Sequence, residues 1–488
     1  MSIKKRLFLV AVFLCIAVWA GFYLQSLHFG LHNFKDSAYY IILAESLSHF
    51  QGLRAMCYPG HPLSKYCAPL FPLMLSPILY FFGRNFVLMH GLVLLFSLLT
   101  LFFTYKYIEN ASDSRMAFWV TLYLICSWVF FRFSIEILTD IPFMFFISLS
   151  LYLFTLYIQD DKYLSSRGIM LSVAIVLAYF CRYAGIILFV SLEAYLLFRK
   201  ENKKAIFLGS VFIVPFLLWN LRNLFVVNIF EPSLSQQLSS FLKASHFFNN
   251  LKLYRFYFPD TLLPLFEFNP RYHLLYRKIY LFIDFIVLMG LYINLRDKKN
   301  VFLGIFYLLF LLLLFLWPAF SGGRYFLPLL SLTIFFFLQG LRTVMQQITF
   351  LKQKYVFSFL VGLMIAFSFY YTFFVFRPSH IAMPYYSQDF YKLLLWAKNN
   401  IDFNKNEIVA SNRPTVTYFV LGHESFTVAI PDQTQNRSRM NEYKVRYIFL
   451  TIPIALRRKE LVPFFRAYGE RIYLLRKEGE SYLYKIIN

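Results

Sequence analysis

The stretch from Phe86 to Ile108 reads FVLMHGLVLLFSLLTLFFTYKYI, and Lys106 is its only Lys, Arg, Asp or Glu. At about 1.5 Å per residue, a helix of this length crosses the roughly 30 Å hydrocarbon core of a bilayer. Similar apolar blocks recur along the chain, separated by short charged segments. The pattern predicts a polytopic α-helical membrane protein.

The composition agrees with this class of protein. Of the 488 residues, 59% are hydrophobic, 21% are aromatic and only 15% are charged. A soluble domain has roughly 45–50% apolar and about 25% charged residues, so a cytosolic enzyme with a membrane tail is excluded. The formal net charge is +23. In a polytopic protein, this excess of positive charge indicates basic loops on the cytoplasmic side. It also indicates anionic membrane lipids as partners, and binding to nucleic acid is not expected.

About eleven membrane spans are expected. The first apolar block is long for a signal peptide and lacks a clear cleavage site before Gln25, so it is interpreted as an uncleaved span. The predicted spans are residues 7–24, 86–108, 116–133, 141–158, 168–181, 184–198, 205–227, 278–295, 301–318, 325–341 and 355–376.

The distribution of charge gives the orientation of the spans. With the N-terminus in the cytoplasm, the short outside loops 134–140 and 319–324 hold almost no Lys or Arg. The positive-inside rule is then obeyed from loop to loop. The basic clusters of the inside loops are Lys4–Arg6, Arg199–Lys204, Arg296–Lys299 and Arg342–Lys354.

Three larger segments then lie outside the cytoplasm: 25–85, 228–277 and 377–488. In the first of them, Pro69–Gly83 is apolar but short and holds three prolines, which favours a helix along the interface over a further span. The predicted domains are therefore a transmembrane domain over 1–376, including the first two outside loops, and an extracytoplasmic domain over 377–488.

The sequence pattern of the last segment, residues 377–488, is typical of a small α/β domain. A helix is predicted over Asp389–Asn400, with Ser387 as a cap, and another near Pro453–Tyr468. A hairpin is predicted where Arg471–Leu475 and Ser481–Ile486 flank a short polar turn. Further strands are predicted at Glu407–Ser411, Val416–Leu421, Phe426–Ile430 and Lys444–Thr451.

Carboxylates at the outer membrane face are candidate catalytic residues, because an acid near hydrocarbon is costly. Asp36 follows the first span, and Asp140 closes the short loop that also holds Glu136. Two converging carboxylates can act as a general base and hold a divalent cation or the nucleophile. The alternative is structural: Asp36 caps the segment Ser37–Phe50, and Asp140, with Thr139, caps the next helix.

Cations at the same face form a second candidate set. Arg182, Arg222 and Arg324 lie at the outer ends of spans, and Lys65 lies in the first loop. Guanidinium groups bind phosphate or pyrophosphate through paired hydrogen bonds, which fits a lipid phosphate at this depth. The alternative is that each side chain only extends to the lipid headgroups and has no role in a binding site.

Signatures of soluble enzymes are missing from the sequence: it has no P-loop, no Gly-rich dinucleotide turn after a strand, no CxxC pair and no HExxH. Cys57 and Cys67 share the first outside loop, where either a disulfide or two thiols is chemically permitted. No metal set is defined by the spacing of the nine histidines. A divalent cation is left open, and no other cofactor is expected.

Several short motifs in order resemble the GT-C membrane glycosyltransferases. They are Asp36-Ser-Ala-Tyr39-Tyr40, Pro69-Leu-Phe-Pro-Leu73, Glu136-Ile-Leu-Thr-Asp140, Arg182-Tyr-Ala-Gly185, Trp219-Asn-Leu-Arg222-Asn223 and Arg324-Tyr325-Phe-Leu-Pro328. The chain is most similar to bacterial members of the dolichyl-phosphate-mannose-protein mannosyltransferase-like group, including the aminoarabinose transferases that modify lipid A. The resemblance covers roughly residues 7–376.

This resemblance implies a multi-pass enzyme of the bacterial inner membrane with its active site and C-terminal domain on the periplasmic side. It would transfer a hexose or pentose from a polyprenyl-phosphate donor to a lipid, glycan or protein, with inversion. Matched by position, Asp36 becomes the general base, and Asp140 with Glu136 organises the acceptor or a cation. The three arginines and Lys65 would stabilise the departing phosphate, and Tyr39, Tyr40 and Tyr325 would contact the sugar.

Two other functions are compatible with the sequence. One is a flippase or exporter of lipid-linked glycans, and the other is a polymerase of envelope polysaccharide. A transporter needs polar side chains at the middle of the membrane, where this sequence has few. A transferase needs its acids at one face, as Asp36 and Asp140 are predicted to be.

Overall fold

The computed structural model separates the chain into two compact units. A helical unit contains the described residues from Val87 to Arg222 and from Ala244 to Arg377, and a smaller unit contains those from Phe34 to Phe86 and from Ser387 to Ile486. The residues that the structure describes are 20, 21, 24, 34–65, 67–226, 244–265, 273–317, 323–347, 353–377, 387–404, 406–428, 433–451 and 472–486.

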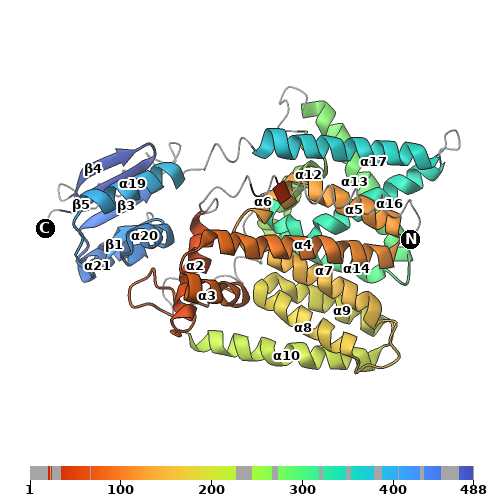
Figure 1. The fold of residues 1–488 in the computed structure, drawn as a ribbon, viewed down its shortest axis with the longest axis horizontal. Helices are drawn as coiled ribbons and strands as arrows, with labels where there is room; N and C mark the ends of the chain where they lie inside the picture. The colour runs from red at the N-terminus through yellow and green to blue at the C-terminus, as the bar shows by residue number, and fades with distance from the viewer. Residues whose placement is uncertain are drawn as a thin grey trace. The chain divides into compact units, whose positions relative to one another are not determined.

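Every predicted span from 86–108 onward falls on one or more helices of the structure, so the polytopic helical class is confirmed (Figure 1). The helices are α4 (Phe86–Ala111), α5 (Ser114–Cys126), α6 (Trp128–Ser134), α7 (Asp140–Tyr157), α8 (Ser166–Cys181), α9 (Ile186–Phe198), α10 (Asn202–Phe225), α12 (Ala244–Leu262), α13 (His273–Arg296), α14 (Val301–Leu316), α15 (Gly323–Phe326), α16 (Leu330–Gln347) and α17 (Gln353–Tyr370). Short 3-10 turns lie at Tyr183–Gly185 and Leu327–Leu329, and a π-helical turn lies at Tyr371–Phe376.

Six helices among the described residues are long and apolar enough to cross a membrane, or seven if α5 and α6 form one span. Three further apolar helices that match predicted spans, including α8 and α14, have fewer than 18 residues. The total of eleven spans stays a prediction, and its first member, 7–24, falls almost entirely outside the described residues. Helix α12 belongs to the predicted outside segment 228–277.

The predicted span 116–133 is broken in the structure. Helices α5 and α6 meet at a bend of 63° beside Ser127. The bend leaves the last carbonyls of α5 without intrahelical partners. Hydroxyl groups at the end of α17 and in the π-helical turn that follows it satisfy one of them, because Ser368 Oγ and Thr372 Oγ1 both donate to the Cys126 carbonyl, at 2.9 and 2.7 Å. This arrangement stabilises a break that hydropathy alone does not indicate.

Helices α13 and α16 pack against each other with their backbones in close contact at two glycines. A Cβ placed on Gly290 would lie 1.8 Å from the Phe336 carbonyl oxygen, and one on Gly340 would lie 2.1 Å from that of Ile286. Small residues allow such close packing between helices in a membrane, where burial of apolar surface gives little drive to associate. The crossing therefore requires glycine at both positions.

Replacing Gly290 by Ala is expected to force the two helices apart, because the obstructing atom belongs to the backbone. Overpacking of this kind costs about 1–3 kcal/mol or more. Thermal unfolding of the purified protein in detergent should show a fall in melting temperature of several degrees. Gly362→Ala on α17 is the control, since a Cβ there meets nothing within 4 Å. Equal melting of the two variants would contradict the close crossing.

The smaller unit contains a five-stranded sheet of order β2-β1-β3-β5-β4. Strands β1 (Val409–Ser411), β2 (Ser425–Thr427) and β3 (Tyr447–Thr451) are parallel, and β4 (Ile472–Glu478) and β5 (Ser481–Ile486) form an antiparallel hairpin on β3. Helix α19 (Ser387–Asn400) packs against the sheet through Phe390, Leu393 and Leu394. The small α/β domain, its hairpin and its first helix are confirmed.

One predicted strand of this domain is wrong. Residues Val416–Leu421 form part of helix α20 (Pro414–Leu421). The β-branched residues indicated a strand, but Pro414 favours the first turn of a helix, and Gly422, at φ 80°, ends it in the left-handed conformation. Helix α21 (Gln433–Glu442) was not predicted, and the helix predicted near Pro453–Tyr468 lies outside the described residues.

The first outside loop packs with the C-terminal sheet in the smaller unit. Helices α2 (Phe34–Ser48) and α3 (Leu70–Phe82) contact each other, and α2 contacts α20. The Arg84 guanidinium lies 4.4 Å from the centre of the Phe419 ring and donates to the Phe419 carbonyl at 3.0 Å. The Ser425 amide donates to the Cys57 carbonyl at 2.9 Å. Loop and sheet therefore share one core; the domain boundary at 376/377 and the interfacial placement of α3 stay predictions.

Candidate functional site

Asp140 is the most deeply buried charged group that the sequence singled out. It begins α7, and its side chain is 0% exposed. A buried carboxylate is costly unless cations and hydrogen bonds compensate it. The compensation for Asp140 comes from two arginines that are far apart in the sequence.

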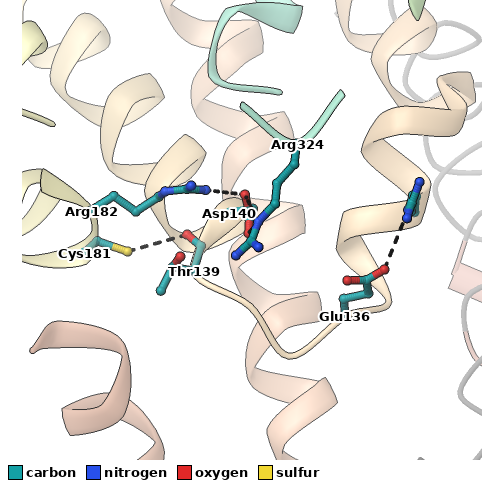
Figure 2. A network of polar contacts seen from close by, with 7 residues as sticks. Glu136, Thr139, Asp140, Cys181, Arg182 and Arg324 are labelled. Carbon is teal, nitrogen blue, oxygen red and sulfur yellow. Dashed lines mark hydrogen bonds and ion pairs between the residues drawn. The ribbon is translucent and has the colours of Figure 1, made fainter. Parts of the chain in front are cut away.

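Arg182 and Arg324 both hold the Asp140 carboxylate (Figure 2). Arg182 follows the last residue of α8 in an extended conformation, and its Nη1 donates to Asp140 Oδ1. Arg324 lies on the short helix α15, and its Nε donates to Asp140 Oδ2 at 3.0 Å and to Oδ1 at 3.2 Å. Figure 2 shows the two guanidinium groups reaching the carboxylate from different sides. We call these three residues the Asp140 cluster.

Two aromatic rings lie beside the Arg182 guanidinium of this cluster. The Arg182 guanidinium lies 5.2 Å from the ring centre of Tyr325 and 5.9 Å from that of Phe143. Tyr325 in turn packs edge-on against Trp317 at 5.3 Å. A cation over an aromatic face is stabilised by about 0.5–2 kcal/mol. The rings and the carboxylate together fix the direction of the Arg182 side chain.

The cluster carries more positive than negative charge. Two guanidinium groups face one carboxylate, and each arginine side chain keeps 16% of its surface exposed. The two guanidinium groups are therefore partly accessible to a ligand. A partly exposed cationic pair beside an aromatic ring suits a phosphate joined to a sugar or a lipid.

The capping interpretation of Asp140 does not match this geometry. A cap accepts hydrogen bonds from the backbone amides of the first turn. The N-cap residue of α7 is Thr139, which makes no side-chain cap, and the hydrogen bonds of the Asp140 carboxylate come from the two arginines. The Thr139 carbonyl accepts from Cys181 Sγ at 3.6 Å, which ties the start of α7 to the end of α8.

Two other predicted residues of the helical unit lie apart from the carboxylate of Asp140. Glu136 is 5% exposed, and its Oε1 lies 3.7 Å from Nε of Arg132, one turn earlier in the chain (Figure 2). Arg222 lies near the end of α10, where its guanidinium is 4.9 Å from the ring centre of Trp219. Arg132, near the end of α6, was not predicted; its spacing of four residues from Glu136, which lies just after α6, is the signal that indicates this pair.

The other predicted residues belong to the smaller unit. Asp36 lies in the first turn of α2, and Lys65 lies in the loop before α3. Tyr39 Oη donates to Ser64 Oγ at 3.1 Å, and Tyr40 packs edge-on against Phe71 at 5.4 Å. Both tyrosines therefore hold the loop together, and the predicted approach of Asp36 to Asp140 stays a prediction.

The described part of the chain shows neither a metal-binding cluster of three residues nor the disulfide considered between Cys57 and Cys67. There, no three His, Cys, Asp or Glu side chains gather in a way that could hold a metal ion. Cys57 and Cys67, which are both described and both buried, are present as thiols and not as a disulfide. Cys57 lies in a small apolar cluster with Ile42 and Ala55.

The comparisons with known proteins agree with the motifs of the sequence. The family model described as dolichyl-phosphate-mannose-protein mannosyltransferase matches residues 61–221, which include Asp140 and Arg182. The structure is similar to the crystal structure of ArnT from Cupriavidus metallidurans in the apo state, with a TM-score of 0.63, 13% identity and 97% of each chain covered. The chain has the GT-C fold.

Two further solved structures share this GT-C fold. ArnT from Cupriavidus metallidurans bound to undecaprenyl phosphate matches with a TM-score of 0.61 and 13% identity over 97% of each chain. The Archaeoglobus fulgidus oligosaccharyltransferase matches with a TM-score of 0.59 and 12% identity, over 90% of this chain and 68% of that one. A search of the curated proteins finds no match. The GT-C resemblance predicted from the sequence is confirmed, and the family match indicates a membrane glycosyltransferase.

Proposed function

We propose that this chain transfers a sugar from a polyprenyl-phosphate carrier to an acceptor outside the cytoplasm, in the inner membrane of a bacterium. The observation that carries the proposal is the Asp140 cluster, in which a buried carboxylate holds two partly exposed arginines. The GT-C fold and the mannosyltransferase family match support the same reaction class.

The cluster has the properties that a leaving-group site needs. As the bond between the anomeric carbon and the phosphate oxygen breaks, negative charge grows on the phosphate. Cations already fixed in place stabilise that charge without reorganisation. Because both oxygens of Asp140 accept hydrogen bonds from the arginines, Asp140 is proposed as a positioning residue for Arg182 and Arg324.

The general base is proposed to be Asp36. A hydroxyl or amine of the acceptor attacks the anomeric carbon, its proton passes to the Asp36 carboxylate, and the polyprenyl phosphate leaves. A single displacement of this kind inverts the anomeric carbon. The position of Asp36 in the first turn of α2, after the first predicted span, supports this role, and Lys65, Arg222 and Glu136 are proposed as further polar groups of the site.

The acceptor class is proposed to be a lipid, glycan or protein of the cell envelope. A similar crystal structure is that of ArnT bound to undecaprenyl phosphate, which supports an undecaprenyl-phosphate carrier here. The C-terminal sheet domain shares its core with the loop that carries Asp36, so we propose that this domain helps to shape the acceptor side.

The proposal is tested with the purified chain in vesicles that contain undecaprenyl-phosphate-linked sugars and an envelope extract as acceptor. We expect release of undecaprenyl phosphate together with sugar incorporation into the extract. Movement of the intact lipid-linked sugar across the bilayer without release would instead identify a flippase. Extension of the carrier-linked glycan would identify a polymerase.

A further inference from the structure

A second polar site lies at the end of α7 far from Asp140. An open cavity of about 640 Å³ is lined by residues at the end of α7, the end of α9 and the turn between α13 and α14. Helix α7 has 18 residues, so this cavity and Asp140 are ~27 Å apart along the helix axis. The two sites are therefore separate.

Three cations and two acids line this cavity: Arg199, Lys298, Lys299, Glu201 and Asp297. The acids already have partners in their own turns. Asp297 accepts hydrogen bonds from the Lys299 amide at 3.0 Å and from Asn300 at 2.6 Å, and Glu201 lies 3.5 Å from Lys204 Nζ.

Two of the three cations, Arg199 and Lys298, keep their charge available for a ligand. The third cation already has a hydrogen-bond partner, because Lys299 Nζ donates to the Asn110 carbonyl at 3.0 Å. Arg199 and Lys298 are exposed, and among the described residues neither forms an ion pair with a carboxylate. The Tyr195 hydroxyl donates to the Lys298 carbonyl at 3.3 Å and ties the end of α9 to this turn. This hydrogen bond holds two walls of the cavity together, and Arg199 and Lys298 are available there to bind a ligand.

The neighbouring surface is apolar. Leu197 and Phe198, which directly precede Arg199, are 58% and 75% exposed. In a helix that crosses a bilayer, such exposed side chains contact acyl chains. A cationic cavity beside lipid-facing side chains suits a ligand with an anionic head and an apolar tail better than it suits a free phosphate.

We propose that this cavity binds the phosphodiester headgroup of an anionic phospholipid, with Arg199 and Lys298 as its cationic contacts. The distribution of basic residues in the sequence places this end of the helices in the cytoplasm, so the lipid belongs to the inner leaflet. The site is distinct from the sugar-transfer site and does not depend on the function proposed for it.

The test measures binding of dioleoyl phosphatidylglycerol to the purified full chain in detergent by native mass spectrometry. The double variant Arg199→Gln/Lys298→Gln should bind this lipid about 30-fold more weakly, because each cation at a bilayer surface contributes about fivefold. Lys298→Gln alone, in an exposed turn, should lose about fivefold. Dioleoyl phosphatidylcholine, which has no net charge, should bind weakly to all variants.

The matched control is Lys200→Gln/Lys203→Gln, which removes the same charge from exposed neighbours that do not line the cavity. We expect its affinity for phosphatidylglycerol to stay within about threefold of the wild-type value. An equal loss in both double variants would overturn the proposal, because it would show general charge attraction. Competition by glycerol 3-phosphate at the same concentration as the lipid would overturn it in favour of a soluble phosphate ligand.

Discussion

The variant Asp36→Asn should transfer sugar about 1000-fold more slowly than the wild-type protein. An amide has nearly the shape of the carboxylate but cannot accept the acceptor's proton, and a positioned general base contributes about 10²–10⁴-fold. Binding of undecaprenyl phosphate should change less than about twofold, because the proposed phosphate contacts are arginines. The measurement is release of undecaprenyl phosphate from a labelled sugar donor, beside a binding titration of the same preparation.

Asp161→Asn is the control for this experiment, because it removes an exposed carboxylate from the loop between α7 and α8. It should transfer sugar at the wild-type rate. Retained turnover in Asp36→Asn would remove Asp36 from the role of base. A parallel loss of lipid-phosphate binding would instead make Asp36 part of the donor site.

The variant Asp140→Asn should lose both stability and activity. Removing one partner from a buried ion pair costs about 3–5 kcal/mol, since it leaves charge without compensation. In this variant Arg182 and Arg324 would face each other across a neutral amide. The melting temperature in detergent should fall by several degrees, and sugar transfer should fall because the arginines are no longer held in place.

The variant Asp113→Asn tests whether burial of the ion pair causes the loss of stability expected in Asp140→Asn. Asp113 also pairs with an arginine, Arg342, at 3.0 Å, but the two side chains are 44% and 48% exposed. Asp113 caps α5 by accepting from the Met116 amide, and Asn caps about as well as Asp. The loss should therefore stay below about 1 kcal/mol. Equal melting temperatures of Asp140→Asn and Asp113→Asn would show that the buried Asp140 cluster contributes no more to stability than an exposed ion pair.

Long apolar blocks predicted the helices well, because the bilayer sets their length and leaves few alternatives. The break between α5 and α6 was not predicted, since it depends on hydroxyl groups about 240 residues away in the sequence that satisfy the Cys126 carbonyl. The strand predicted at Val416–Leu421 is a helix because Pro414 and Gly422 outweigh the β-branched residues between them. The first difference depends on distant hydrogen bonds and the second on the backbone preferences of Pro and Gly, and hydropathy measures neither.

The three residues of the Asp140 cluster were each singled out from the sequence, but their contact with one another was not predicted. The sequence placed Asp140 among the acids and Arg182 and Arg324 among the cations, as two sets with separate roles. The structure brings them together as one cluster. Which side chains meet depends on how α7, α8 and α15 pack, and a single sequence does not determine that. The burial of Asp140 changes its proposed role from acceptor organiser to positioning residue.

The Asp140 cluster is proposed to bind the phosphate of a polyprenyl carrier. The triple variant Asp140→Asn/Arg182→Gln/Arg324→Gln tests this binding most directly, because it removes the three charges of the cluster together, and its melting temperature in detergent is measured beside its affinity. The control is Asp113→Asn/Arg115→Gln/Arg342→Gln, the same three residue types at an exposed cluster. We expect undecaprenyl phosphate to bind the first variant about 100-fold more weakly and the second as tightly as wild type. Unchanged affinity in the first variant would contradict the claim.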